Sequence, residues 1–141
     1  MKRIIKFRGK FVGNGKWTYG DLISFGYKML SIFDDDTVST LPLEKLLYDN
    51  DVLPETVGQF TGLLDETGKE IYEGDILEGK FLSIGERRAL VVFVGKAAAF
   101  MVKYEGRDTA TAIFNCGWFD EGVRCKVIGN IYDNPKLFKM K

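Results

Sequence analysis

The feature that most constrains the fold is an alternation of apolar and polar residues, with a period of two, along most of the chain. Successive side chains of a β-strand point to opposite faces of a sheet, so this period is typical of strands with one buried face. The alternating stretches are also rich in aromatic and β-branched residues, which favour strands over helices. We therefore expect a mainly β protein of antiparallel hairpins and a small SH3-like barrel or barrel-like meander, with one or two short helices.

The first hairpin is the best defined of the predicted elements. It joins strands at 4–12 and 17–24, and the Asn14-Gly15 pair between them is typical of the central positions of a type I′ turn. A two-residue loop at Asn14-Gly15 predicts these cross-strand pairs: Val12 with Trp17, Lys10 with Tyr19, Arg8 with Asp21, and Gly9 with Gly20. One face of the hairpin would then be aromatic and charged, and the other apolar.

Further elements follow from turn residues and short apolar runs. The pattern predicts strands at 27–33, 89–94, 97–104, 109–116 and 123–132, and a short helix at 40–47. Asp65-Glu66-Thr67-Gly68 fits a type I turn closed by a left-handed glycine, and Glu73-Gly74-Asp75 fits a tight corner before a strand. Pro135 should end the last strand and begin one helical turn through Phe138.

The length of 141 residues is near the usual size of one domain, so we expect a single domain over 1–141. A division into an N-terminal hairpin lobe, 1–53, and a barrel-like lobe, 54–141, is compatible with that size.

Charge and hydropathy exclude some classes of function. Twenty basic and twenty acidic residues cancel, so the chain as a whole does not favour nucleic acid, and binding to it would need a local basic patch. There is no apolar run of about 20 residues and no charged start leading into an apolar segment. We expect neither membrane insertion nor export, and therefore a cytoplasmic location.

The two cysteines are too few for a disulfide scaffold or a four-cysteine zinc site. A two-residue loop at Asp120-Glu121 would place Cys116 opposite Cys125, whereas a three-residue loop would place it opposite Lys126. In a reducing cytoplasm both registers predict two buried thiols.

The chain lacks histidine, which removes the most frequent general base and the most frequent metal ligand. It also lacks a Walker A loop, a dinucleotide-binding glycine fingerprint and an EF-hand loop. We expect no metal, no cofactor and no catalytic residues. The enzymatic alternative rests on the carboxylates Glu70, Glu73 and Asp75, two of which would have to lie close together as acid and base.

Lys6, Arg8 and Lys10 alternate along the first strand, and Trp17 and Tyr19 alternate along the second. Cations interleaved with aromatic rings are typical of surfaces that bind single-stranded nucleic acid. The simpler interpretation is structural: Arg8 pairs with Asp21, Trp17 covers Val12, and the lysines protect the strand from pairing with other chains.

Three separated segments resemble the YopX family of phage and prophage proteins. They are IKFRG at 5–9 with GKWTYGDL at 15–22, PETVGQFTGLLDETGKEIYEGDI at 54–76, and VIGNIYDNP at 127–135. The resemblance implies a phage accessory protein without an established activity. Eight residues of these segments have no explanation from backbone geometry and, with Tyr19, form the candidate binding set: Arg8, Trp17, Asp21, Glu55, Gln59, Thr61, Tyr72 and Asp75.

Three hypotheses for function follow. The first is a non-enzymatic module that binds a host or phage protein, with homo-oligomers through sheet edges as a further expectation. The second is a protein that binds single-stranded nucleic acid, and the third is a carboxylate-dependent enzyme.

Overall fold

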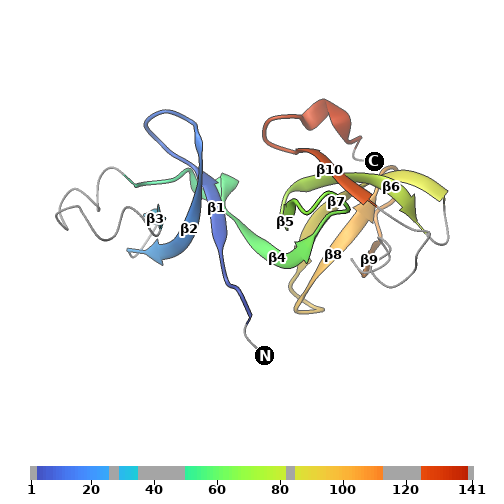
Figure 1. Ribbon diagram of the computed structural model, residues 1–141, viewed down its shortest axis with the longest axis horizontal. Coiled ribbons are helices and arrows are strands. Elements are labelled where there is room, and N and C mark those ends of the chain that lie inside the picture. Colours follow the sequence, from blue (N-terminus) through green and yellow to red (C-terminus); the bar gives the residue numbers. More distant parts are fainter. Residues whose placement is uncertain (1–2, 26–28, 35–49, 82–84, 113–124, 140–141) are drawn as a thin grey trace. The chain divides into compact units, whose positions relative to one another are not determined.

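A computed structural model of the chain describes residues 3–25, 29–34, 50–81, 85–112 and 125–139 (Figure 1). These ranges contain the elements β1 (Phe7–Lys10), β2 (Trp17–Ser24), β3 (Leu30–Phe33), η1 (Pro54–Thr56), β4 (Gly58–Leu64), β5 (Glu70–Tyr72), β6 (Asp75–Phe81), β7 (Gly85–Val94), β8 (Ala99–Tyr104), β9 (Ala110–Ala112), β10 (Cys125–Asn130) and η3 (Pro135–Leu137). The expected mainly β fold is confirmed. The predicted helix at 40–47 and the pairing of Cys116 lie outside the described residues.

The chain divides into two compact units, Met1–Phe60 and Thr61–Lys141, which we call the N-terminal and C-terminal units. In the N-terminal unit the antiparallel order is β3-β2-β1-β4, and β4 continues into the C-terminal unit.

The segment 50–53 bridges β1 and β3, the two strands that flank β2. The Val52 amide donates to the Leu30 carbonyl at 2.9 Å, and the Leu53 amide donates to the Lys10 carbonyl at 2.8 Å. Ile32 and Val52 are buried, and a Cβ added at Gly9 would lie 3.1 Å from atoms of both. The absence of a side chain at Gly9 therefore lets β1 approach this small core.

The predicted register of the first hairpin is wrong by two residues. Arg8 lies opposite Tyr19, Lys10 opposite Trp17, Gly9 opposite Thr18 and Phe7 opposite Gly20. The reason is a loop of four residues rather than two. The Phe11 amide donates to the Lys16 carbonyl at 3.0 Å, and the Gly15 amide donates to the Phe11 carbonyl at 2.9 Å.

Asn14 acts in this loop through its side chain. Its Oδ1 accepts a hydrogen bond from the Lys16 amide at 2.9 Å, and Gly15, but not Asn14, has a positive φ. A type I′ turn needs a positive φ at both central positions, so Asn14-Gly15 does not form one. Because the register changes by an even number of residues, each side chain stays on its predicted face.

The C-terminal unit contains an antiparallel sheet in the order β10-β6-β7-β8-β9. One cluster of buried side chains fills its main core: Ile71, Leu77, Ala89, Val91, Val102, Tyr104 and Cys125. The turn predicted between β4 and β5 is present, because the Gly68 amide donates to the Asp65 carbonyl at 3.0 Å and Gly68 has a φ of +86°.

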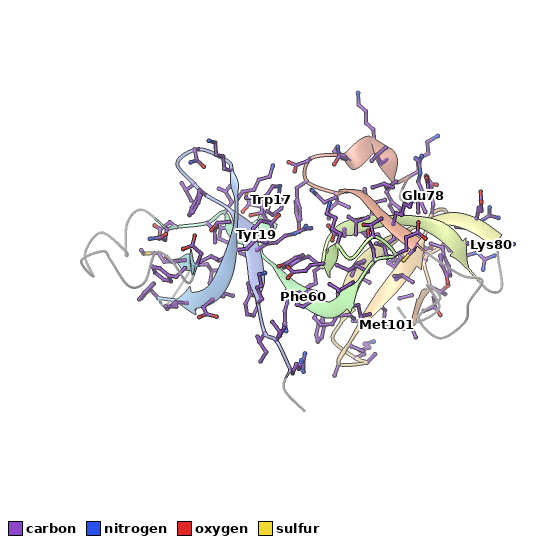
Figure 2. All side chains as sticks on the ribbon, viewed as in Figure 1. Trp17, Tyr19, Phe60, Glu78, Lys80 and Met101 are labelled. Carbon is purple, nitrogen blue, oxygen red and sulfur yellow. The ribbon has the colours of Figure 1, made fainter. Side chains whose placement is uncertain are left out.

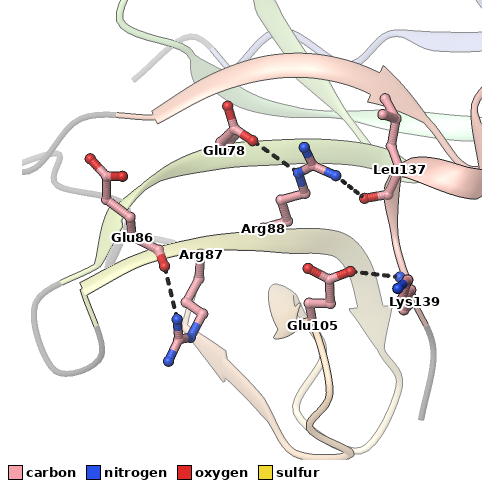
Figure 3. Close-up of polar contacts among 7 residues, drawn as sticks. All are labelled: Glu78, Glu86, Arg87, Arg88, Glu105, Leu137 and Lys139. Atoms are coloured by element: carbon pink, nitrogen blue, oxygen red, sulfur yellow. Dashed lines mark hydrogen bonds and ion pairs between the residues drawn. The ribbon is translucent and has the colours of Figure 1, made fainter.

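The predicted helical turn after the last strand is present as η3, and it leads into a segment that covers a second apolar cluster. Phe138 is buried against Ile76 and Leu90. Figure 3 shows the Arg88 guanidinium between the Glu78 carboxylate, at 2.9 Å from Nε, and the Leu137 carbonyl, at 3.0 Å from Nη1.

We expect Arg88→Met to destabilise the C-terminal unit by about 1–2 kcal/mol, because it removes one partly buried hydrogen bond and one exposed ion pair but keeps the apolar stem. Urea unfolding with hydrogen exchange at residues 137–139 measures this effect. Arg87→Met is the control, since Arg87 contacts the carbonyl of its neighbour Glu86 on an exposed surface. Equal effects of the two substitutions would contradict the role of Arg88.

Candidate functional site

The β1–β2 hairpin brings together four of the residues that the sequence singled out. Arg8 and Lys10 of β1 lie opposite Tyr19 and Trp17 of β2 on one face of the sheet. The Arg8 guanidinium carbon lies 4.7 Å from the centre of the Trp17 ring, and the Lys10 ammonium lies 5.3 Å from it. Both distances are within the range of cation–π attraction.

The four side chains differ in their access to solvent. Arg8 is only 5% exposed, Lys10 and Trp17 are half-buried, and Tyr19 is 41% exposed. Figure 2 labels Trp17 and Tyr19 on β2. On its other side, Arg8 lies opposite Gly58 of β4, which has no side chain. The predicted positions of Trp17 over Val12 and of Arg8 opposite Asp21 are wrong, because the register places both partners two residues away.

The remaining candidates of the N-terminal unit are Asp21, Glu55 and Gln59. Asp21 and Glu55 are exposed, and Gln59 is half-buried opposite Phe7. Sequence reasoning missed Thr56, whose buried hydroxyl accepts from the Lys10 amide at 2.9 Å and donates to the Leu53 carbonyl at 2.7 Å. A Ser or Thr next to a short proline-initiated helix is the signal for such backbone bonding.

The three candidates of the C-terminal unit have clear structural contacts. Asp75 is 1% exposed, and its Oδ2 accepts from the Tyr72 amide at 2.8 Å across the Glu73-Gly74 corner. The Tyr72 hydroxyl donates to Glu70 at 2.6 Å, and the Thr61 hydroxyl donates to the Ile71 carbonyl at 2.8 Å. These contacts hold the β4–β5–β6 connections.

Sequence reasoning also missed the role of the Asp65 carboxylate. Its Oδ1 accepts from the Thr67 amide, the Thr67 hydroxyl and the Lys69 amide at 2.7–3.0 Å, and its Oδ2 accepts from the Val127 amide of β10 at 3.0 Å. Burial raises the pKa of Asp65, but the bonds from Thr67, Val127 and Lys69 lower it more, so the pKa lies below its ordinary value of 3.8.

The neighbouring Glu66 makes further contacts with β10. Its amide donates to the Cys125 carbonyl at 3.1 Å, and its carboxylate lies 3.2 Å from the Lys126 ammonium. The turn at 65–68 therefore joins the β4–β5 hairpin to the outer edge of β10. The contacts of Asp65 and Glu66 thus have a structural role.

The described residues contain neither a cluster suited to a metal ion nor a helix suited to a membrane. No group of three or more His, Cys, Asp or Glu side chains in this part of the chain is arranged to hold a metal ion. Among the described residues, no helix has the length and hydrophobicity needed to cross a membrane.

Comparison with known proteins gives a family and a fold. The chain is similar in structure to the crystal structure of protein EF1440 from Enterococcus faecalis, with a TM-score of 0.51 and 23% sequence identity over 98% of this chain and 100% of that one. No curated protein matches the sequence. The model of the family described as YopX protein matches residues 6–139, nearly the whole chain, and the protein therefore belongs to the YopX family.

Proposed function

We propose that this protein is a non-enzymatic interaction module, a phage or prophage accessory protein that binds a host or phage protein in the cytoplasm of the host cell. Membership of the YopX family supports this context through the resemblance that the sequence already indicated. The nature of the exposed surface supports the choice of a protein partner.

The observation that carries the proposal is the position of the exposed apolar side chains. Nine large ones are exposed in the described part of the chain, and seven of them fall between residues 4 and 29: Ile4, Ile5, Val12, Tyr19, Ile23, Phe25 and Met29. Concentrated exposed apolar surface marks sites of protein interaction, because association removes that surface from water.

The last three of these residues form a local patch, which we call the β2–β3 patch. Ile23 belongs to β2, Phe25 follows that strand, and the Phe25 amide donates to the Met29 carbonyl at 2.9 Å just before β3. Each side chain of the patch is 38–41% exposed. An apolar cluster of this kind, held by strand pairing, suits an apolar surface of a partner protein.

The contacts of the acidic residues favour binding over catalysis. Asp75 is buried in a hydrogen bond to the Tyr72 amide, and Glu70 accepts from the Tyr72 hydroxyl. A general acid or base must reach substrate, whereas these oxygens face the protein's own turns.

The test is recovery of tagged protein from induced host cells after mild crosslinking, with nuclease treatment, followed by mass spectrometry. We expect a stoichiometric partner protein with the wild type, and at least a tenfold loss of that partner with the double substitution Ile23→Ser and Phe25→Ser. Leu64→Ser is the matched control, because Leu64 is 44% exposed in the C-terminal unit. All variants should keep the wild-type circular dichroism, since exposed sites contribute little to stability.

Two results would contradict the proposal: recovery of bare protein, or equal recovery of the partner by the double variant and the wild type. Light scattering across micromolar concentrations separates a foreign partner from a second copy. A mass that doubles in the wild type and not in the double variant would assign the β2–β3 patch to self-association instead.

A further inference from the structure

The neutral net charge of the chain conceals a strong separation of charge along the sequence. Residues 1–33 contain seven Lys or Arg residues and a single acidic residue, Asp21, whereas residues 34–78 contain thirteen acidic and two basic residues. All described cations of the first group belong to the N-terminal unit. The N-terminal unit as a whole is neutral, with eight basic and eight acidic residues over 1–60. The positive charge that attraction of a polyanion requires is therefore local to its first 33 residues, which include the β1–β2 hairpin.

The cations and aromatic rings of this unit form one surface, the cation–aromatic face, defined by Lys6, Arg8, Lys10, Trp17 and Tyr19. Arg8 and Lys10 lie opposite Tyr19 and Trp17, so a positive group and a ring face each other across both pairs. Lys6 immediately precedes β1 at the next alternate position, where its carbonyl accepts from the Phe60 amide at 2.8 Å.

Each member of the face has a distinct role that follows from its burial. Arg8, 5% exposed and stacked on Trp17, supplies a fixed positive charge beneath the surface. Lys6 and Lys10 are half-buried and add two positive charges to the face. Tyr19, 41% exposed, offers an aromatic ring beside them.

We propose that the cation–aromatic face binds single-stranded nucleic acid without sequence preference. An acidic peptide would need the cations alone, whereas a nucleic acid also uses the accessible ring, because every unpaired base can stack on it. A duplex keeps its bases stacked inside, so the single-stranded form suits Tyr19 better. This surface shares no residue with the β2–β3 patch, and the inference does not depend on the proposed protein partner.

The test is fluorescence anisotropy of the full chain with a labelled oligothymidylate of about 20 nucleotides, longer than the ~4–16 nucleotides that one OB-fold covers. With Lys6 and Lys10 neutralising about two phosphates, affinity should fall roughly sevenfold as salt rises from about 50 to about 200 mM. Tyr19→Ala should weaken binding at least fivefold, the loss expected for one stacked base. Lys10→Gln should lower the slope of log affinity against log salt by about 0.7.

Matched substitutions in the C-terminal unit serve as controls. Phe93→Ala removes an aromatic ring that is 51% exposed, and Lys96→Gln removes an exposed lysine of the β7–β8 turn. Neither should change affinity by more than about twofold, and circular dichroism confirms folding of every variant.

Three outcomes would overturn the inference. One is no binding at about 50 mM salt, and another is equal loss of affinity in Tyr19→Ala and Phe93→Ala. The third is displacement of the oligonucleotide by polyglutamate at equal charge concentration, which would show that the face recognises negative charge alone.

Discussion

Gly20→Ala should cause the largest loss of stability of any single methyl group added to the N-terminal unit. A Cβ at this position would lie 2.0 Å from the Phe33 carbonyl oxygen, 2.6 Å from its carbon and 2.9 Å from the Asp34 nitrogen, and the φ of Gly20 is +155°. Because all three atoms belong to backbone, no side chain can rotate away, and β2 must separate from β3. We expect a loss of about 3 kcal/mol or more, a large share of the stability of a domain.

Chemical denaturation, together with hydrogen exchange at the β2 and β3 amides, measures this loss. Gly13→Ala is the control, since a Cβ there meets no atom within 4 Å and the φ of Gly13 is not positive. Its stability should change by less than about 1 kcal/mol, with a small gain from reduced freedom of the unfolded chain. Similar stabilities of the two variants would refute the close approach of β2 to β3.

Asp65→Ala should cause the second largest effect, a loss of about 3 kcal/mol in the C-terminal unit. The substitution removes the acceptor of the Thr67 and Lys69 amides in the turn and of the Val127 amide in β10. Buried donors without an acceptor cost about 1–3 kcal/mol each before the structure relaxes. Asp65→Asn should also destabilise the unit, because an NH2 group replaces one carboxylate oxygen and cannot accept a hydrogen bond from a backbone amide.

The control for this prediction is Glu66→Gln at the neighbouring residue, which weakens the ion pair between Glu66 and Lys126. That ammonium side chain is 59% exposed, so solvent screens the pair, and the change should stay below about 1 kcal/mol. Urea unfolding of the three variants at neutral pH compares them directly. A loss in Asp65→Ala no greater than in Glu66→Gln would show that the turn does not hold β10.

The same carboxylate predicts how stability depends on pH. The pKa of Asp65 is lower in the folded chain than its ordinary value of 3.8, because hydrogen bonds to the carboxylate outweigh the opposing effect of burial. Its contribution is therefore fully present above the unfolded-state pKa and is lost as pH falls through 3.8 toward the folded-state pKa. The wild type should lose stability in this acid range more steeply than Asp65→Asn, and parallel curves would contradict the assignment.

The hairpin of β1 and β2 shows where reading the sequence succeeds and where it fails. The alternation placed Arg8, Lys10, Trp17 and Tyr19 on one face, because the period of two is a local property of each strand. The same sequence did not reveal the partners across the strands. These depend on the hydrogen bond from the Phe11 amide to the Lys16 carbonyl, which closes a loop of four residues.

The site residues show the same division. The tight corner at Glu73-Gly74-Asp75 was predicted, and the bond from the Tyr72 amide to the Asp75 carboxylate, three residues apart, spans it. Thr56 was not singled out, and Asp65 was named only as part of a turn, because their partners Lys10 and Val127 lie 46 and 62 residues away in the sequence.

The sequence by itself therefore determined the class of fold, most of the strands, the glycine turn at Asp65–Gly68 and, through three motifs, the YopX family. Each of these depends on neighbouring residues, whose preferences are fixed before any long-range pairing forms. Only the tertiary structure decided the register, the approach of Gly20 to Phe33, and the attachment of Asp65 to β10. The approach of Gly20 to Phe33 and the attachment of Asp65 to β10 join segments that are separated in the sequence, so their geometry follows from the packing of strands. The register depends on the hydrogen bond that closes the loop between Phe11 and Lys16, which the Asn14-Gly15 pattern did not reveal.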